Sequence, residues 1–453
     1  MKRLTIIIFV LGLAVLSAQT NDATLSLQQA RELALQNNSA YQAKAAELEA
    51  AKWSKTSAIS SILPSMSLDG TWLYMDPAQT VQAGGSAITL NHDFRTFGLS
   101  LTQPIFVGGK AWQGYQMAKL GESMAQTGLE AQKLTLLTEV NNNYLGLLQT
   151  QDLTRISEMD KRSAEINLQI AQLKFDNGLL SNADYLRFKS QLASKEVTFL
   201  QAQTARQLAQ LNLRNYLGID FLPVAEELPG VENDPVMETL NGYSPVASSA
   251  LSELALQRSQ EANTSLRLLE NGVELSRRSY QMSKGSFLPT VMLIGSLNFE
   301  ENGIDRYKFD SSSQIMLTAS IPLLPQLGNY AAMRKANFEY KKTLLQAKTA
   351  TDGIKLGTES AVLNLVSAAK QVQAAGLSLE FTQQTYEQLQ ERFRMNLISS
   401  KDLLDADLML SASRVAYSNA VFAYHKARVS LMQILGLENA EDLDTMIIIG
   451  ANK

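Results

Sequence analysis

Apolar residues recur at helical spacing through two long stretches that contain no proline. In the first stretch, three- and four-residue steps connect Leu137, Val140, Tyr144 and Leu147. Residues at this spacing share one face of an α-helix, and a proline inside the helix would cost about 3 kcal/mol. The pattern predicts long helices within 105–222 and within 326–453, the first of them over about residues 110–174.

Each predicted long helix ends at a turn signal, and a second helix follows. Asn177-Gly178 ends the first one, because glycine readily adopts the left-handed conformation that caps many helices. The chain then returns through a helix that ends at Leu217-Gly218. Asn396 occupies the matching place in the second half of the chain, and asparagine also tolerates that conformation.

Four segments alternate apolar and polar residues, as β-strands with one apolar face do. Two of them follow Pro64 and Pro289 and two precede Pro104 and Pro322, so these prolines are predicted to be junctions between strands and helices. The apolar positions are Met66, Leu68, Trp72, Tyr74, Phe97, Leu99, Leu101, Val291, Leu293, Leu297, Phe299, Ile315, Leu317, Ala319 and Ile321. Trp72 and Tyr74 suit either an aromatic belt at a membrane boundary or packing between subunits.

The order helix, strand, loop, strand, long helix and return helix is predicted twice, and the sequence itself repeats. Phe393–Leu404 resembles Phe175–Leu186 after a shift of 218 positions, and Glu253–Gln257 repeats Glu32–Gln36. Matches in the same order indicate a duplicated unit. We predict a first structural repeat over 19–218, an inter-repeat linker over 219–247, where prolines cluster, and a second repeat over 248–453.

The first residues have the order of a secretory signal. Lys2 and Arg3 precede an apolar run over residues 4–16, and Ser17-Ala18 precedes a polar stretch. This order predicts a signal peptide over 1–18, because the run is too short to favour a membrane anchor. No later window of about 18 residues is apolar throughout. The exported chain is therefore expected either to be soluble outside the cytoplasm or to enter a membrane as strands.

The composition disfavours several classes of function. The 453 residues carry a formal net charge of −4, which provides no concentrated basic face for nucleic acid. The absence of cysteine excludes thiolate chemistry and disulfides, and only two histidines, His92 and His425, argue against zinc sites and histidine catalysis. No nucleotide-binding loop or catalytic cluster is apparent. The sequence thus predicts no enzyme, no metal and no cofactor.

The predicted strands are about ten residues long, which is enough to cross a bilayer when tilted. Strands in lipid must close into a barrel, and four are fewer than the roughly eight of the smallest such barrels. Closure would therefore need several copies of the chain. A soluble sandwich is the alternative, but helices of about 100 Å would project far beyond so small a sheet.

Together these features resemble the TolC-like outer membrane efflux proteins of Gram-negative bacteria. The resemblance covers essentially the whole mature chain and rests on the duplicated element order, the Gln-Pro-Ile-Phe-Val-Gly-Gly run at 103–109 and the tip motifs around 178 and 396. It implies an α+β membrane protein in which long antiparallel helical coils form a periplasmic tunnel. Four β-strands per chain would contribute to a trimeric 12-stranded β-barrel, with residues 77–92 and 301–311 as outward-facing loops.

The resemblance also implies roles for the two tips. Asp402 and Asp405 would form the periplasmic entrance constriction, where three chains would give a ring of carboxylates that favours cations. Asp405 has no acidic counterpart in the first repeat, where the matching residue is Arg187. Docking of a periplasmic adaptor would use residues that are otherwise plain hairpin turns, namely Asn177, Gly178, Leu179, Leu180, Asn396, Leu397, Ile398 and Ser399.

Helix capping is the simpler role for part of each tip motif. Ser181 with Asp184, and Ser399 with Asp402, have the spacing of a capping box. Members of the family are generally held shut by polar links between neighbouring coils at the tip. Phe393 and Ile398 stand at the obvious positions and cannot form salt bridges, so a closing link would need other groups or apolar contact.

The leading functional hypothesis is an outer membrane channel protomer that acts as the passive exit duct of a tripartite efflux pump or type I secretion system. Its expected partners are two further copies in a homotrimer, a periplasmic adaptor (membrane fusion) protein that opens the tip, an inner-membrane pump and outer membrane lipid. The alternatives are a periplasmic coiled-coil scaffold and a surface receptor, both without transport activity.

Overall fold

The computed structural model describes residues 23–83, 85–228, 230–231, 234–301, 304–305, 307–324 and 326–451, so the predicted signal peptide lies outside it. The chain divides into two compact units. Unit 1 holds the described residues up to Asn38, within Leu136–Gly242 and within Leu365–Val429, and unit 2 holds the rest.

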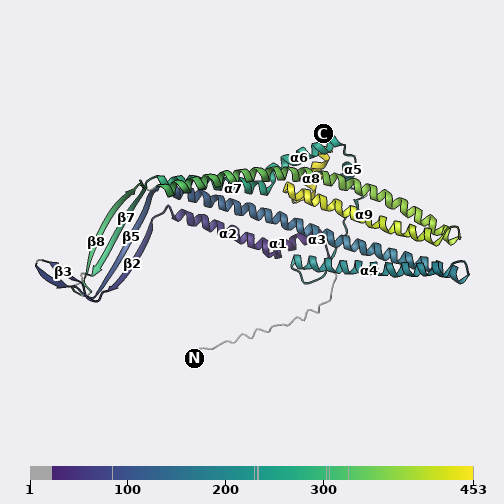
Figure 1. Ribbon diagram of the computed structural model, residues 1–453, viewed down its shortest axis with the longest axis horizontal. Helices are drawn as coiled ribbons and strands as arrows, with labels where there is room; N and C mark the ends of the chain where they lie inside the picture. Colours follow the sequence, from purple (N-terminus) through teal and green to yellow (C-terminus); the bar gives the residue numbers. More distant parts are fainter. Residues whose placement is uncertain are drawn as a thin grey trace, which may run out of the picture. The chain divides into compact units, whose positions relative to one another are not determined.

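Helices dominate both units (Figure 1). The helices are α1 (Leu27–Asn37), α2 (Ser39–Ser60), α3 (Lys110–Asp176), α4 (Asn182–Leu217), α5 (Pro235–Asn241), α6 (Pro245–Ala262), α7 (Thr264–Lys284), α8 (Leu327–Arg394), α9 (Ser400–Leu435) and α10 (Ala440–Ala451), with the 3-10 helix η2 (Gly285–Phe287). The strands are β1 (Ala23–Leu25), β2 (Ser65–Tyr74), β3 (Thr80–Ala83), β4 (Ser86–Thr89), β5 (Asp93–Val107), β6 (Pro223–Ala225), β7 (Thr290–Glu301) and β8 (Phe309–Ser320).

The two predicted long helices and their return helices are confirmed. α3 has 67 residues and α8 has 68, while α4 and α9 have 36 residues each. The order of two strands, a long helix and a return helix occurs once as β2, β5, α3, α4 and again as β7, β8, α8, α9. Whether the repeats have the predicted boundaries stays a prediction. No helix within the described ranges has a stretch that is both long and apolar enough to cross a membrane.

The four predicted strands form one antiparallel sheet in unit 2, in the order β2-β5-β7-β8 (Figure 1). Residues paired in register share a face, and the register pairs Leu68 with Leu99, and Leu99 with Leu297. The opposite face is mixed: Ser67 pairs with Ser100, their hydroxyls 2.8 Å apart, but the same face also holds the paired Ile294 and Met316. The alternation of the sequence therefore becomes one largely apolar face and one mixed face across the four strands.

Pro104 does not mark a junction between strand and helix, because β5 continues through it to Val107. The pairing of β5 with β2 ends at Thr102, so Pro104 pairs only with β7, opposite Met292. The register slips between Pro104 and Phe106, as at a β-bulge. A bulge beside a strand end tolerates the missing N–H of proline, which explains why the strand does not stop.

The actual junction after β5 is the glycine pair Gly108-Gly109. Both residues have positive φ, 65° and 72°, which glycine adopts without a steric penalty. A Cβ atom on Gly108 would lie 2.2 Å from the carbonyl oxygen of Gly285, at the corresponding turn before β7. The Gly-Gly pair therefore allows two strand–helix connections of unit 2 to approach each other closely.

Two segments expected to be irregular contain short strands. The predicted outward-facing loop at 77–92 includes the β3–β4 hairpin, and the predicted linker includes β6, α5 and the start of α6. β6 pairs in parallel with β1 in unit 1, where the Tyr144 hydroxyl donates to the carbonyls of Leu25 (2.8 Å) and Glu226 (3.0 Å). Strands of three or four residues are too short to produce a readable alternation.

Candidate functional site

The candidate site comprises the two helical tips, both in unit 1. Gly178 and Asn396 lie between the helices of each hairpin with φ values of 72° and 63°. Leu179 N–H donates to the carbonyl of Lys174 (2.8 Å), and Leu397 N–H donates to the carbonyl of Arg392 (2.9 Å). These bonds span five residues, as in a Schellman cap. The two tips therefore have the same backbone turn although one uses asparagine.

Serine caps begin both return helices. The Asp184 N–H donates to Ser181 Oγ at 3.1 Å, and the Asp402 N–H donates to Ser399 Oγ at 3.3 Å. At the second tip the Asp402 carboxylate also accepts from the Ser399 N–H (3.1 Å) and hydroxyl (2.7 Å). These bonds to Ser399 lower the pKa of Asp402, so its charge persists into acid.

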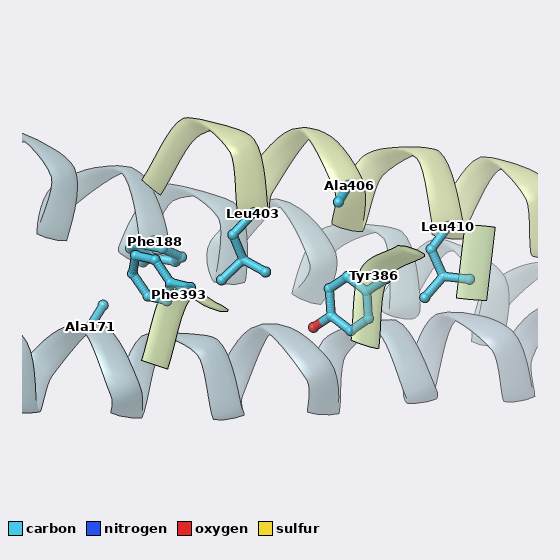
Figure 2. Packing of buried hydrophobic residues seen from close by; sticks show 7 residues of the cluster. All are labelled: Ala171, Phe188, Tyr386, Phe393, Leu403, Ala406 and Leu410. Atoms are coloured by element: carbon cyan, nitrogen blue, oxygen red, sulfur yellow. The ribbon is translucent and has the colours of Figure 1, made fainter. Parts of the chain in front are cut away.

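A buried apolar cluster joins the two hairpins close to the tips (Figure 2). Its members come from all four helices and are Ala171, Phe188, Tyr386, Phe393, Leu403, Ala406 and Leu410. The rings of Phe188 on α4 and Phe393 on α8 lie 5.5 Å apart, a tilted aromatic contact. Leu180 and Ile398 pack against this cluster, whereas Leu179 and Leu397 are exposed. Only part of each predicted docking motif therefore lies on the surface of the chain.

Lys174 makes the polar link between the tips. Its buried ammonium group donates to the carbonyl oxygen of Phe393 and to Oδ1 of Asn396. It also lies 4.3 Å from the centroid of the Phe393 ring, within cation–π range. Burial lowers the pKa of Lys174. A residue on the first hairpin thus holds the backbone and the turn residue of the second.

Tyr386 anchors a second polar contact one layer further from the tips. Its hydroxyl lies 2.7 Å from Ser163 Oγ, accepts from Asn167 (2.9 Å) and accepts from Gln390 (3.1 Å). Burial raises the pKa of this phenol. Hydrogen bonds satisfy the hydroxyl inside the bundle, and two of its partners lie on α3 while Tyr386 lies on α8.

Beyond Tyr386, four buried charged side chains form an ionic layer. The Asp160 carboxylate contacts Arg414 at 2.8 Å and Lys195 at 3.4 Å, and Lys195 also lies 3.6 Å from Asp407. These residues come from α3, α4 and α9, and Arg414 donates further to Gln383 on α8 (3.0 Å). Burial raises the pKa of Asp407, although Lys195 opposes the shift. Two acids and two bases balance, which a buried group of charges requires.

The structure separates the predicted entrance residues from these contacts. Asp402 and Asp405 are both exposed on the first turns of α9 within the single chain. Lys174, Asp160 and Asp407 were not among the predicted site residues. A signal for them existed: Lys174 lies one turn after Ile170 and Asp407 one turn after Leu403, at positions where the helical pattern calls for apolar residues.

Two long helical hairpins and one small antiparallel sheet define the class of fold to which the chain belongs. The family model of the outer membrane efflux protein matches residues 30–219 and 255–437. The chain therefore belongs to the outer membrane efflux protein family, as its residues suggested.

Among similar proteins, the alkaline protease secretion protein AprF of Pseudomonas aeruginosa is 24% identical over 98% of this chain and 91% of its own length. Outer membrane protein TolC of Escherichia coli is 20% identical over 98% of this chain and 88% of its own length. The crystal structure of the Campylobacter jejuni CmeC outer membrane channel superposes with a TM-score of 0.77, at 18% identity, over 93% of this chain and 89% of that one. This last likeness shows a shared fold.

Proposed function

We propose that the chain is one protomer of a trimeric outer membrane channel, the passive exit duct of a tripartite efflux pump or type I secretion system. In this proposal, three four-stranded sheets form a 12-stranded barrel in the outer membrane, and the helices of both repeats, 19–218 and 248–453, form a tunnel in the periplasm. The channel performs no catalysis, so its energy comes from an inner-membrane pump through a periplasmic adaptor.

The single observation that carries the proposal is the uncovered sheet. Its apolar face is exposed, with Leu68 at 75%, Trp72 at 66% and Ile315 at 84%. A contiguous apolar face of this kind needs lipid or a partner, and the opposite, more polar face suits a water-filled lumen. Strands of 10 to 15 residues have the length to cross a bilayer.

The open edges of the sheet support the trimer. β2 and β8 are the outer strands, and within the described residues neither has a second neighbour in that sheet. Strand edges in a bilayer must be paired, because no water is present to satisfy their N–H and carbonyl groups. Pairing β8 of one chain with β2 of the next satisfies both edges, and three chains give a closed barrel of a size that membranes accept.

The two tips form the periplasmic entrance in this proposal. Asp402 and Asp405 from three chains would form its cation-attracting constriction, which their exposure supports. Lys174 is the polar link that Phe393 and Ile398 could not provide, since it binds the second tip through a carbonyl and a side-chain amide. The exposed residues Leu179 and Leu397 are the apolar contacts offered to the adaptor.

Planar-bilayer recording on detergent-purified protein tests the proposal. A trimer that inserts and conducts ions supports the channel. A monomer that needs no detergent and gives no conductance would establish the periplasmic scaffold instead. If a strain that lacks this protein exports its compounds normally, a surface receptor would be favoured even if the purified trimer conducts.

A further inference from the structure

One end of the four-stranded sheet in unit 2 adjoins four helices (Figure 1). β2 begins at Ser65, close to Thr102 of β5, with which it pairs. β5 ends at Val107, which pairs with the first residue of β7, Thr290, and Thr290 pairs with the last residue of β8, Ser320. We call the nine residues of each helix nearest this end the collar, namely 52–60 of α2, 110–118 of α3, 276–284 of α7 and 327–335 of α8.

Side-chain contacts hold the first turns of α3 and α8 against the turn that ends α7. A Cβ atom on Gly285 would lie 3.0 Å from Cγ of Lys110, so this lysine packs directly beside the residue that follows Lys284. The side-chain amide of Asn329 donates to the carbonyl of Ser286 at 3.3 Å. Residues from three different helices of the collar therefore lie together at the end of the sheet.

The charge of the collar has one sign. It contains eight lysine and arginine residues and no aspartate or glutamate. The strand residues at the opposite end of the sheet, 71–74, 93–96, 298–301 and 309–312, contain four acids and one base. The positive charge is therefore confined to the end of the sheet that adjoins the long helices.

Half of these bases already have carboxylate partners. The pairs are Lys52 with Glu49 (2.6 Å), Lys55 with Glu122 (2.5 Å), and Arg277 and Arg278 with Glu274 (2.6 and 2.7 Å). The other four bases have no ion-pair partner in the part of the chain that the structure describes, and they are Lys110, Lys284, Arg334 and Lys335. Lys110 is half-buried and the other three are exposed. The collar thus has positive charge that the chain itself does not neutralise.

The helix dipoles add to this positive charge. α3 and α8 both begin in the collar, and neither has an acidic residue in its first turn. The amino end of a helix carries a partial positive charge and favours anions. Lys110 is the first residue of α3, where a second positive charge is unfavourable unless an anion lies nearby. This end of unit 2 is therefore suited to an anion from outside the chain.

Aromatic and apolar side chains are exposed among the bases. Trp112 and Tyr330 are exposed within the collar, and Leu324 is exposed in the connection between β8 and α8. The ammonium group of Lys284 lies 4.3 Å from the centroid of the Tyr280 ring, within cation–π range. Aromatic residues beside an apolar surface are typical of the boundary between hydrocarbon and lipid headgroups. The collar therefore continues the apolar face of the sheet with a polar, basic border.

We propose that Lys110, Lys284, Arg334 and Lys335 bind the phosphate groups of anionic glycerophospholipids at the membrane surface next to the sheet. The inference rests on the proposed membrane position of the sheet. An acidic protein would match the charge alone. A lipid surface offers phosphate and acyl chains together, so it matches both the bases and the exposed apolar side chains beside them.

Trp112 reports on the lipid next to the collar. The chain has three tryptophans, so Trp53→Phe with Trp72→Phe leaves Trp112 as the only one. This protein is reconstituted in phosphatidylcholine vesicles that contain a small fraction of lipid brominated on its acyl chains, because bromine quenches tryptophan on contact. Brominated phosphatidylglycerol should show an apparent affinity about fivefold higher than brominated phosphatidylcholine at low ionic strength. High salt should reduce this preference.

Equal quenching by the two brominated lipids would overturn the proposal. The bases of the collar would then be left for an acidic protein partner. Quenching by neither lipid, in a protein that still conducts in planar bilayers, would overturn the proposal but leave the channel function standing. A protein that neither inserts into vesicles nor conducts would contradict the channel function and the lipid contact together.

Charge variants then locate the site. The quadruple change Lys110→Gln, Lys284→Gln, Arg334→Gln, Lys335→Gln should remove the preference for phosphatidylglycerol. The control Arg162→Gln, Lys348→Gln, Lys355→Gln, Lys401→Gln removes the same residue types at exposed positions outside the collar and should retain it. Within α8, Lys348 lies about 32 Å from the start of the helix. A preference that survives in the collar variant, or disappears equally in the control, would overturn the assignment to these four bases.

A second measurement keeps the proposal testable if the tryptophan changes prevent assembly. Detergent-purified wild-type protein is exposed to equal amounts of unbrominated phosphatidylglycerol and phosphatidylcholine with the same acyl chains. Native mass spectrometry then compares the lipids that remain bound. Wild type should retain mainly phosphatidylglycerol, and the collar variant should retain the two lipids equally. Equal retention by wild type would overturn the proposal.

Discussion

The ammonium group of Lys174 donates to the main-chain carbonyl of Phe393 and lies 4.3 Å from the centroid of that residue's ring. Lys174 is on α3 and Phe393 on α8, so one side chain joins the first hairpin to the second at the tip. A carbonyl accepts this bond whatever the side chain of residue 393 is. The link therefore does not need a side chain at position 393 that can form a salt bridge.

Lys174→Met is expected to loosen the tip. The variant keeps an unbranched side chain but loses two charge-assisted hydrogen bonds and a cation–π contact, together worth about 3 kcal/mol. In planar bilayers the mean conductance of the variant should rise well above that of wild type. The exposed Lys189, on the first turns of α4, supplies the control Lys189→Met, whose conductance should not change. Identical conductance in all three proteins would exclude Lys174 as a closing link.

Variants of the turn residue Asn396 distinguish the effect of backbone strain from the loss of the contact with Lys174. Asn396→Gly should cost only about 1 kcal/mol, because one acceptor of Lys174 is lost while glycine adopts a φ of 63° freely. Asn396→Ala should cost about 1–2 kcal/mol more through left-handed strain. Thermal unfolding followed by circular dichroism distinguishes the two. Equal stability of the glycine and alanine variants would show that the turn is not held in this conformation.

Lys195 is expected to be the most sensitive position of the ionic layer. Lys195→Met leaves Asp407 buried without its counter-ion and should destabilise unit 1 by about 3–5 kcal/mol. The double variant Lys195→Met, Asp407→Leu should recover most of that loss, since no unpaired charge remains. Breaking the exposed Lys133–Glu438 pair by Lys133→Met should cost less than about 1 kcal/mol. Chemical denaturation of the purified protein measures all three, and additive losses in the double variant would contradict the pairing.

His425 should make the helical unit acid-sensitive. Burial, followed by the nearby Arg428, lowers the pKa of His425 to about 4. The unfolded chain binds a proton near its ordinary pKa of about 6.5, whereas the folded chain does not, so stability falls as the pH drops between these two values. The loss should approach about 3 kcal/mol at pH 4. In His425→Leu the midpoint of unfolding should depend much less on pH over this range. In His92→Gln, at the exposed histidine, the midpoint should depend on pH as in wild type.

Asp402 and Asp405 are predicted to set ion selectivity. Replacing both by asparagine should lower the preference for cations and weaken block by multivalent cations, measured as a shift of the reversal potential in a salt gradient. Asp402→Asn alone also removes the carboxylate that accepts from the Ser399 N–H. The control is therefore Asp184→Asn, the capping acid of the first hairpin. The same shift in the control would mean that any capping carboxylate at a tip has this effect, and that Asp402 and Asp405 do not form a distinct constriction.

Local patterns were sufficient for the long helices, the turns that end them and the presence of the four long strands. The helical spacing around Leu137 and Val140, the glycine of Asn177-Gly178 and the alternation after Pro64 each depend on neighbours within a few residues. The structure agrees with them because backbone conformation there follows local preference. The prediction for Pro104 was wrong because a strand continues through a proline only where no neighbouring strand needs its N–H. This depends on β2, a strand about forty positions earlier that ends its pairing at Thr102.

The sequence by itself determined the long helices, their turns, the alternating strands and the family, since these depend on residue type and short-range order. Tertiary structure decided which groups meet across more than two hundred positions, such as Lys174 with Phe393 and Asp160 with Arg414. The sequence does not predict such contacts, because a charged residue on an apolar helical face is unfavourable unless a partner compensates it, and the partner is distant in the sequence. Only folding brings that partner within reach.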